Sequence, residues 1–380
     1  MNHRKILYGT LVLVWSLAFT ASCIEPYNPP AIKEIVDILV VDGFVNSTDS
    51  SAVVKLSRAI ALSDTGEPTP ELNAAVRIED ENGNFYPLVE TGNGNYAIQK
   101  MNVNPSLKYR LAFTTSNSTQ YASDFIELKI SPPIDSITFR KDPRFERVGI
   151  YINTHDASNT TKYYQWTFNE TWEYTSNHFS TVKLENGSIV PQDEDIYRCW
   201  KTQPSTEIYI SSSNELREDV IRDFQLMAIP VGSTKLSRKF SLEVQQRALT
   251  KEAYDFWLQL KKTTESLGGL FDPLPAQVIG NLKNITNSSQ PVLGYFSGGH
   301  VSKKRIFIKL SDLPIELRKI TPPFCPVDSI ENALLSTYPS MNLIGPYGEP
   351  FVEGYLYSGN SGCMDCTESG GIPVRPDFWE

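Results

Sequence analysis

The sequence has few histidines and none of the motifs that mark the common enzyme classes. Only four histidines occur in 380 residues, and three of them, His155, His178 and His300, lie beyond the N-terminal segment. The chain has no HExxH zinc-protease motif, no GxSxG nucleophile elbow, no Walker loop and no dinucleotide fingerprint. We therefore assign no catalytic residue, no metal ligand and no cofactor, and we expect a protein that is not an enzyme.

The chain also lacks an excess of positive charge. Lysine and arginine number 35 against 44 aspartates and glutamates, which gives a formal net charge of −9. Because nucleic acids and anionic lipid surfaces attract basic proteins, this balance argues against both as direct partners. Beyond the N-terminal segment no stretch is apolar enough to cross a membrane as a helix. Hydrophobic residues make up 40% of the chain, which is typical of a folded globular protein, and the chain length predicts two or three domains.

The N-terminus has the order of a secretory signal peptide. Basic residues precede an apolar run from Ile6 to Phe19, and three small residues then lead to Cys23. The run is about 14 residues long, below the roughly 20 that a membrane-spanning helix requires. This order predicts a signal peptide over residues 1–22 whose cleavage leaves Cys23 as the first residue, as in bacterial lipoproteins. We therefore expect lipidation of Cys23, export, and attachment to a membrane through the N-terminal lipid.

Two alternatives fit the same N-terminal residues. One is an uncleaved transmembrane helix, and the other is an ordinary secreted protein that is cut before Cys23. Thr20 stands where lipoproteins usually have a leucine, three residues before the cysteine. Residues 23–35 are proline-rich and show no hydrophobic periodicity, which predicts a stiff, extended tether behind the anchor.

Four cysteines follow the anchor, and their even number in an exported chain predicts disulfides. They are Cys199, Cys325, Cys363 and Cys366. Three pairings are open, and the sequence does not choose among them. The last two have the CxxC spacing of thioredoxins and of zinc hooks. However, no thioredoxin-like strand and helix surround them, and a four-cysteine zinc site requires a second hook. Structural disulfides are therefore favoured over zinc binding and redox activity.

Residues 36–131 predict an immunoglobulin-like or fibronectin-like β-sandwich. Seven short segments rich in β-branched and aromatic residues are separated there by turn residues. The strongest turn is Asn82-Gly83, a typical hairpin dipeptide between two such segments. The prolines at 132 and 133 end this region and separate it from the next domain.

Residues 134–320 predict a second β-rich, sandwich-like domain that carries one amphipathic helix over residues 251–267. Thr250 is a suitable N-cap, and Gly268 and Gly269 are suitable to end the helix. One face of this helix is apolar and is expected to pack on a sheet. Residues 321–380 are rich in cysteine, proline and glycine, and we expect them to form a tail that disulfides fasten to the domain.

One strand of the second domain is unusually aromatic. Tyr164, Trp166 and Phe168 alternate and therefore share one face of a strand. Such a row of rings could bind a ligand, because sugars stack on exposed aromatic faces. We favour the alternative that the three rings fill the core of the domain, because large apolar side chains are usually buried.

Several segments together resemble the exported lipoproteins grouped as domain of unknown function family 4249. The matching segments are Cys23–Tyr27, the hairpin around Asn82-Gly83, Tyr163–Tyr174, Cys199-Trp200, Leu249–Leu274 and Gly370–Trp379. Members of this family are similar to outer-membrane lipoproteins of Gram-negative bacteria, often encoded near TonB-dependent transporters. The resemblance implies a location in the outer membrane and a TonB-dependent transporter as partner, and it implies no activity.

We therefore expect a lipid-anchored cell-envelope protein that binds a ligand or a protein partner beside an outer-membrane transporter. The alternative is an envelope hydrolase that acts on glycans or peptides, since carboxylates are plentiful in the chain. An enzyme should have a deep pocket with convergent polar groups and carboxylates of shifted pKa. A binding protein should instead present an accessible apolar or aromatic surface.

Overall fold

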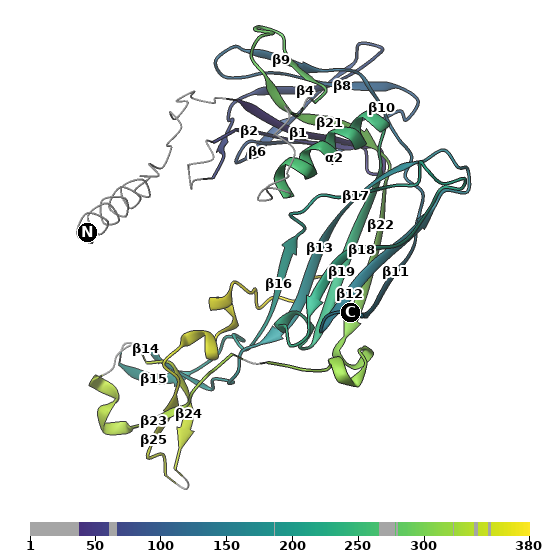
Figure 1. The fold of residues 1–380 in the computed structure, drawn as a ribbon. Helices are drawn as coiled ribbons and strands as arrows, with labels where there is room; N and C mark the ends of the chain where they lie inside the picture. The colour runs from purple at the N-terminus through teal and green to yellow at the C-terminus, as the bar shows by residue number, and fades with distance from the viewer. Residues whose placement is uncertain are drawn as a thin grey trace, which may run out of the picture. The chain divides into compact units, whose positions relative to one another are not determined.

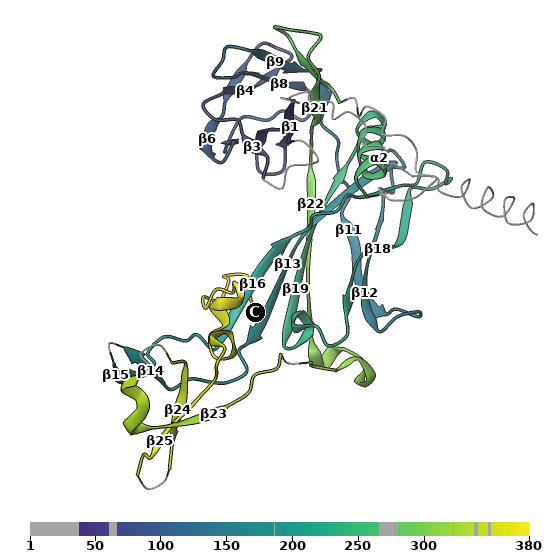
Figure 2. The same ribbon diagram turned by 60° about the vertical axis from the view of Figure 1, so that its left-hand side comes forward.

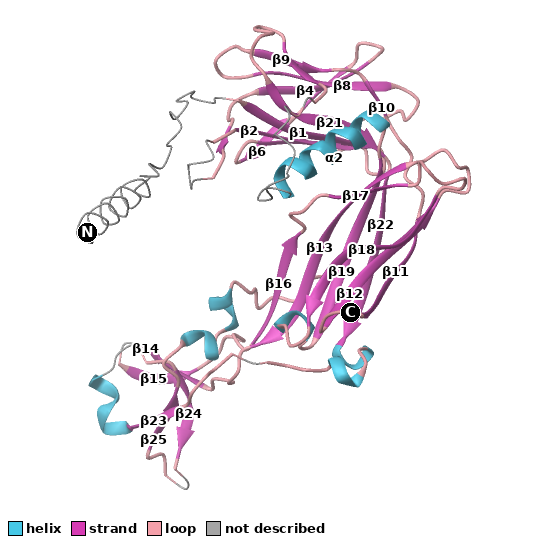
Figure 3. Ribbon diagram, viewed as in Figure 1, coloured by secondary structure: helices cyan, strands magenta, loops and turns pink. Residues whose placement is uncertain are grey.

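The computed structural model describes residues 38–60, 67–185, 187–265, 278, 280–321, 323–337, 341–348 and 351–380. The predicted signal peptide, the tether and Cys23 lie outside these residues. Residues Ile38–Ala59 and Pro68–Glu380 form one compact unit. Strands dominate this unit, as Figure 3 shows, and within the described ranges no helix combines the length and the apolar character needed to cross a membrane.

The N-terminal domain is a sandwich of two six-stranded sheets (Figure 1). The first sheet has the order β21 (Val292–Gly299), β1 (Leu39–Asn46), β2 (Ser51–Arg58), β7 (Asn95–Ile98), β6 (Val89–Gly92), with β3 (Thr69–Pro70) beside β2. The second has the order β20 (Leu282–Asn284), β9 (Gln120–Ser123), β8 (Lys108–Thr114), β4 (Ala75–Asp80), β5 (Phe85–Pro87), with β10 (Ile126–Glu127) beside β8. Buried residues of both sheets form one core, because alternate residues of each strand point inward.

The structure differs from the expected domain boundaries at this sandwich. Residues 36–131 do not complete it, because β20 and β21, from the region 134–320 that we assigned to the second domain, belong to its two sheets. Strand β21 pairs with β1 in parallel from Leu39↔Val292 to Asn46↔Gly299. The chain passes so closely there that a Cβ on Gly294 would lie 1.8 Å from the carbonyl oxygen of Val41. A glycine is therefore required at that position.

The second domain is also built from two sheets. One consists of β11 (Ile134–Lys141), β12 (Arg147–His155) and β18 (Val220–Pro230). The other has the order β16 (Arg198–Pro204), β13 (Tyr163–Thr175), β19 (Lys239–Ala248), β22 (Val301–Lys309), with β17 (Tyr209–Ser212) beside β13. Their inward faces form the largest core cluster of the described chain. Strand β22 follows β21 directly, as Figure 2 shows, so one continuous stretch of chain supplies a strand to each sandwich.

The expected amphipathic helix is α2 (Lys251–Glu265), and its last two predicted residues, 266 and 267, lie outside the described part of the chain. The hydroxyl of Thr250 accepts a hydrogen bond from the backbone N–H of Ala253 at 3.2 Å, as an N-cap does. Ala253 and Phe256 are buried against Leu249 and Tyr295. The apolar face of the helix therefore packs on strand residues, as its spacing predicts.

The C-terminal region contains more regular structure than the expected tail. A three-stranded sheet forms from β23 (Asp328–Glu331), β25 (Gly354–Tyr357) and β24 (Leu343–Tyr347), and it packs near the hairpin β14 (Val182–Glu185) and β15 (Ser188–Pro191). Short 3-10 helices occur at η1 (Thr234–Leu236), η2 (Leu310–Asp312), η3 (Ile315–Leu317), η4 (Asn332–Thr337), η5 (Ser361–Cys363) and η6 (Cys366–Ser369). Burial of Ile330, Leu335 and Leu343 gives this region a small core of its own.

All four cysteines of the folded region form disulfides, as expected. Cys199 pairs with Cys366, and Cys325 pairs with Cys363. The two cysteines of the CxxC motif therefore bond to different partners rather than to each other. The bridge from Cys199 lies in the core of the second domain and fastens the C-terminal region to strand β16.

Candidate functional site

The alternating aromatic residues Tyr164, Trp166 and Phe168 of strand β13 belong to the core and offer no ring face to a ligand. Tyr164 and Trp166 have 0% of their surface exposed, and Phe168 has 5%. The ring of Trp166 stacks on Phe224 at 4.6 Å and on Tyr164 at 5.8 Å between centroids. The burial supports the core role that we favoured from the sequence, and it argues against a ligand platform on these three rings.

A hydrogen-bond network connects this core to the boundary between the domains. The indole N–H of Trp166 donates to Oε1 of Gln246 at 2.9 Å. The amide of Gln246 then donates to the carbonyl of Pro132 at 2.8 Å and to the hydroxyl of Thr154 at 3.1 Å. Because Gln246 is fully buried, these bonds satisfy polar groups that would otherwise be costly inside the protein.

The most enclosed carboxylate of this domain, Asp219, is sealed from solvent. It is 1% exposed, and it accepts hydrogen bonds from the hydroxyls of Tyr164, at 2.6 Å, and of Ser213. The pKa of the Tyr164 hydroxyl is raised well above its usual range. Burial is the larger cause, and the neighbouring Asp219 carboxylate is the second. A substrate cannot reach these groups, so the serine, tyrosine and aspartate stabilise the fold and do not form a catalytic set.

Replacing Tyr164 by phenylalanine is expected to destabilise the protein by about 1–3 kcal/mol, because it removes a donor from a buried carboxylate. Equilibrium denaturation of the purified variant measures this loss. Tyr163→Phe is the matched control, since Tyr163 is only partly buried and its ring packs beside Tyr254. Equal unfolding midpoints for Tyr164→Phe and the control would show that the network contributes no stability.

A cleft with a volume of about 930 Å³ is lined by strand ends and by the start of α2. Strand ends of the first sandwich supply one side, including Asp124, Glu127 and Lys129, and the start of α2 and the end of β19 supply the other, including Lys251. Lys283 pairs with Asp124 at 2.6 Å, and Lys129 pairs with Glu127 at 3.3 Å. Lysines therefore pair with two of the acidic residues of the cleft, and Glu252 at the start of α2 is a third acidic residue in its lining.

A small hollow of about 20 Å³ shares part of its lining with the cleft. Leu249, Thr250 and Tyr295 line both spaces, and Phe44 and Ser297 close the hollow on the side of the first sandwich. Burial raises the pKa of the Tyr295 hydroxyl, which is hydrogen-bonded to the side chain of Thr250. The hollow has room for about one water molecule, so the surrounding side chains are closely packed.

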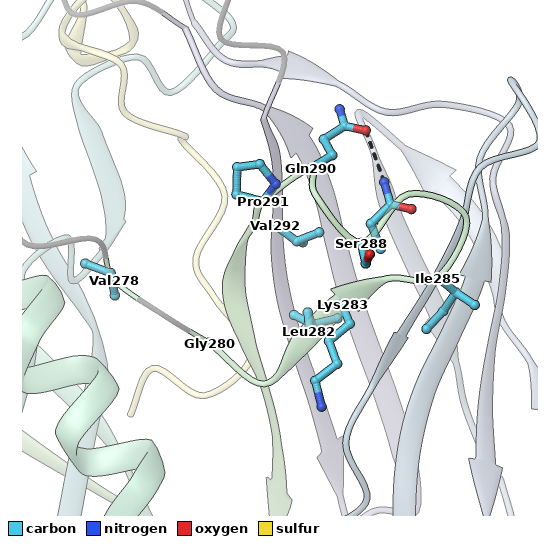
Figure 4. Close-up of a pocket in the computed structure, with 10 residues that line it drawn as sticks. Val278, Gly280, Leu282, Lys283, Ile285, Ser288, Gln290, Pro291 and Val292 are labelled. Atoms are coloured by element: carbon cyan, nitrogen blue, oxygen red, sulfur yellow. Dashed lines mark hydrogen bonds between the residues drawn. The ribbon is translucent and has the colours of Figure 1, made fainter.

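A second recess of about 490 Å³ lies beside strands β20 and β21 (Figure 4). Leu282, Pro291 and Val292 give it an apolar lining. One polar contact in it is the hydrogen bond from the Asn284 amide to Oε1 of Gln290 at 3.1 Å, drawn dashed in Figure 4. Lys283 and Ser288 also line the recess.

Metal binding finds no support within the ranges that the structure describes. They contain no group of three or more histidine, cysteine, aspartate or glutamate side chains that could hold an ion. His155 bonds through Nδ1 to Asp135 at 2.8 Å, which raises the pKa of the histidine, and His178 contacts the carbonyl of Cys325 at 3.1 Å. His155 and His178 therefore stabilise local structure through these contacts.

The residues of the cleft were not among the site residues that we predicted. Cys23 lies outside the described residues, and the four other cysteines and the three aromatic residues are structural. The cleft forms where strand ends from distant parts of the sequence meet, and no motif or periodicity marks such positions. The charged residues Asp124, Glu127 and Lys129, which alternate in part with apolar ones, were the signal that the sequence offered at this position.

Comparison with known proteins adds little beyond the family. No curated protein matches the chain. Among solved structures, the chain is similar to the crystal structure of the selenomethionine-substituted interferon gamma receptor alpha chain from chicken, with 11% sequence identity over 54% of this chain and 86% of that chain. The TM-score is 0.16, which is too low to support a conclusion about fold or function.

The family expected from the sequence segments is the one that the comparison identifies. The sequence model of a domain of unknown function, DUF4249, matches residues 24–305, which is most of the chain. The matched range includes the first sandwich, with its late strands β20 and β21, and most of the second. The protein therefore belongs to the DUF4249 family.

Proposed function

We propose that the protein is a lipid-anchored outer-membrane protein that binds a ligand or a protein partner, without catalysing a reaction, as an accessory to a TonB-dependent transporter. The observation that carries the binding role is the cleft of about 930 Å³ between strand ends and the start of α2. Its volume lies in the range of ligand sites, and its lining mixes charged and apolar side chains.

The absence of a reactive set in the cleft supports binding over catalysis. Of the three acidic residues in the cleft lining, Asp124 and Glu127 are held in ion pairs and Glu252 is the third, and the lining that the structure describes contains no histidine or cysteine. A hydrolase needs a nucleophile or an acid–base pair within reach of its substrate. The sealed Asp219 cluster cannot supply one, because its carboxylate is buried.

The proposed location rests on the N-terminal sequence and on the family. The basic residues, the apolar run and Cys23 have the order of a lipoprotein signal. Several acyl chains on one cysteine would hold the protein stably on a membrane, whereas one chain alone anchors weakly. The sandwiches would then be held at the membrane surface by the proline-rich segment at 23–35.

Replacing Cys23 by serine is expected to release the protein from the membrane or to leave it unprocessed. Fractionation of cells and labelling with a radioactive fatty acid measure both outcomes. Thr20→Leu is the matched control, because it restores the usual residue before the cysteine and should leave anchoring intact. Membrane attachment and acylation of Cys23→Ser at the level of the original protein would contradict the proposal.

The choice between binding and hydrolysis is tested with the purified folded region. Incubation with cell-wall glycans, polysaccharides and peptides is expected to give no hydrolysis products above a heat-denatured control. Saturable product formation that Asp124→Asn or Glu127→Gln abolishes would overturn the proposal and favour an envelope hydrolase.

A further inference from the structure

A groove of about 320 Å³ lies in the C-terminal region, where β14 and β24 lie side by side (Figure 2). Segments that are distant in sequence form its walls. They are β14, the two ends of the loop Gln192–Ile196, the start of β24, and the short helices η5 and η6 with the residues between them. This C-terminal groove is separate from the cleft of the proposed function, because the two linings share no residue.

Backbone hydrogen bonds and disulfides hold the walls of the C-terminal groove in place. The N–H of Gln192 donates to the carbonyl of Thr181 at 3.0 Å, and the N–H of Thr181 donates to the carbonyl of Ile344 at 2.8 Å. The N–H of Cys366 donates to the carbonyl of Ile196, also at 2.8 Å. One disulfide reaches η5 and the other reaches η6. The groove is therefore formed before a ligand arrives, which lowers the entropy lost on binding.

The lining combines apolar side chains with carboxylates. Its apolar residues are Val182, Leu184, Ile196, Met341, Leu343 and Met364. Its acidic residues are Asp365 and Glu368. One oxygen of Asp365 caps η6 by accepting hydrogen bonds from the backbone N–H and the hydroxyl of Thr367, at 2.8 and 2.6 Å. The second oxygen accepts no hydrogen bond within the described chain, so it is available to a ligand.

The negative charge at the C-terminal groove is not balanced by bases. Lys183 is the one basic residue in the described lining, and Glu185 pairs with it at 4.0 Å. The residues between the two ends of the loop, Asp193, Glu194 and Asp195, add three exposed acids. No carboxylate of the lining or of this loop forms an ion pair within the part of the chain that the structure describes. The groove therefore attracts cations and repels anions.

We propose that the C-terminal groove binds an arginine side chain from a basic segment of a partner protein. The methylenes of the arginine would contact the apolar lining, and its guanidinium would bond to the carboxylates of Asp365 and Glu368. The volume is at the lower end of the range of ligand sites, which suits one long side chain. Further basic residues of the same segment would be attracted by the exposed acids Asp193–Asp195.

This inference goes beyond the proposed function. It adds a second binding surface and requires neither the cleft beside α2 nor the lipid anchor. A failure here leaves the proposed function standing, and a failure of the proposed function leaves the groove as a site for a basic partner.

Isothermal titration of the folded protein with three tripeptides tests the assignment. The probes are triarginine, triglutamate, and a tripeptide of 2-amino-3-guanidinopropionic acid, which carries the same guanidinium on a single methylene. Triarginine is expected to saturate one site and to bind at least about tenfold more tightly than its short analogue, because only the longer stem covers the apolar lining. Triglutamate is expected not to bind. Equal affinities of the two basic peptides, or tighter binding of triglutamate, would overturn the assignment.

A pair of double variants separates binding in the groove from general attraction to a chain of net charge −9. Asp365→Asn with Glu368→Gln removes both carboxylates of the lining and keeps an oxygen at 365 to cap η6. This variant should weaken triarginine binding by about tenfold or more. The control, Glu215→Gln with Glu218→Gln, removes two exposed charges outside the lining and should change the affinity by less than about twofold.

Glu368→Gln alone keeps the test decisive if the double variant does not fold, because Glu368 is exposed. It should still weaken triarginine binding more than the control does. Equal effects of the groove variants and the control would overturn the assignment. Saturable calcium binding that competes with triarginine, and that Glu368→Gln abolishes, would overturn it in favour of a metal site.

Discussion

Replacing Trp166 by alanine is expected to destabilise the protein by about 3–5 kcal/mol, one of the largest effects of any single substitution in this chain. The substitution opens a large cavity, because the indole is fully buried and stacks on Tyr164 and Phe224. It also leaves the side-chain oxygen of Gln246 without its indole donor inside the core. Equilibrium denaturation of the purified variant measures the free energy of unfolding.

Phe85→Ala is the control for this measurement, because Phe85 is 67% exposed on strand β5. Exposed positions of this kind usually change stability by no more than about 0.5 kcal/mol. An unchanged unfolding midpoint and slope for Trp166→Ala would show that the indole does not support the core. The ligand-platform interpretation of β13 would then have to be reopened.

Removing the bridge between Cys199 and Cys366, by alanine at both positions, is expected to cost about 2–5 kcal/mol. The bridged residues are 167 positions apart, against 38 for Cys325 and Cys363. In the chain-entropy description a longer closed loop restricts the unfolded chain more, which adds about 1 kcal/mol to the effect of the first bridge. Its two sulfurs also belong to the core of the second domain, so their loss leaves a cavity.

The same denaturation experiment on the double variant Cys325→Ala, Cys363→Ala measures the contribution of the second disulfide to stability. This second bridge should contribute less, because its loop is shorter and Cys325 is partly exposed. A larger loss from this pair than from the Cys199, Cys366 pair would contradict the account. Mass mapping without reduction should find the two pairings of the structure in protein taken from the native envelope.

Local features of the fold could be predicted because their causes lie within a few residues. The turn Asn82-Gly83 joins β4 to β5, with Gly83 at a positive φ of 86° and the carboxylate of Asp80 accepting from the backbone N–H of Asn84 at 2.9 Å. Thr250 caps α2 as expected. Hairpins and capped helices carry such signals in the sequence itself.

The strands that cross the expected domain boundary could not be predicted in the same way. Strand β21 completes the first sandwich by parallel pairing with β1, although most strands of the second sandwich lie between them in sequence. Such a pairing depends on tertiary contacts and leaves no local pattern beyond a short apolar and aromatic segment. The small C-terminal sheet was missed for a related reason, since glycine and proline interrupt β24.

The candidate site was beyond prediction because its parts are distant in sequence. Asp124, Glu127 and Lys129 come from the segment around β10, and Lys251 comes from the start of α2. Each looks ordinary in its own segment, as a charged residue near a strand or at the start of a helix. Only the folded arrangement shows that these residues line one cleft.

The central claim is that this DUF4249 protein works as an anchored partner of an outer-membrane transporter. Chemical crosslinking of intact cells, followed by purification of the protein and mass spectrometry, tests it most directly. The account predicts that a TonB-dependent transporter is recovered with the original protein, and not with equally abundant, folded Cys23→Ser protein. Recovery of no such transporter with anchored, folded protein, or equal recovery with both forms, would contradict the account.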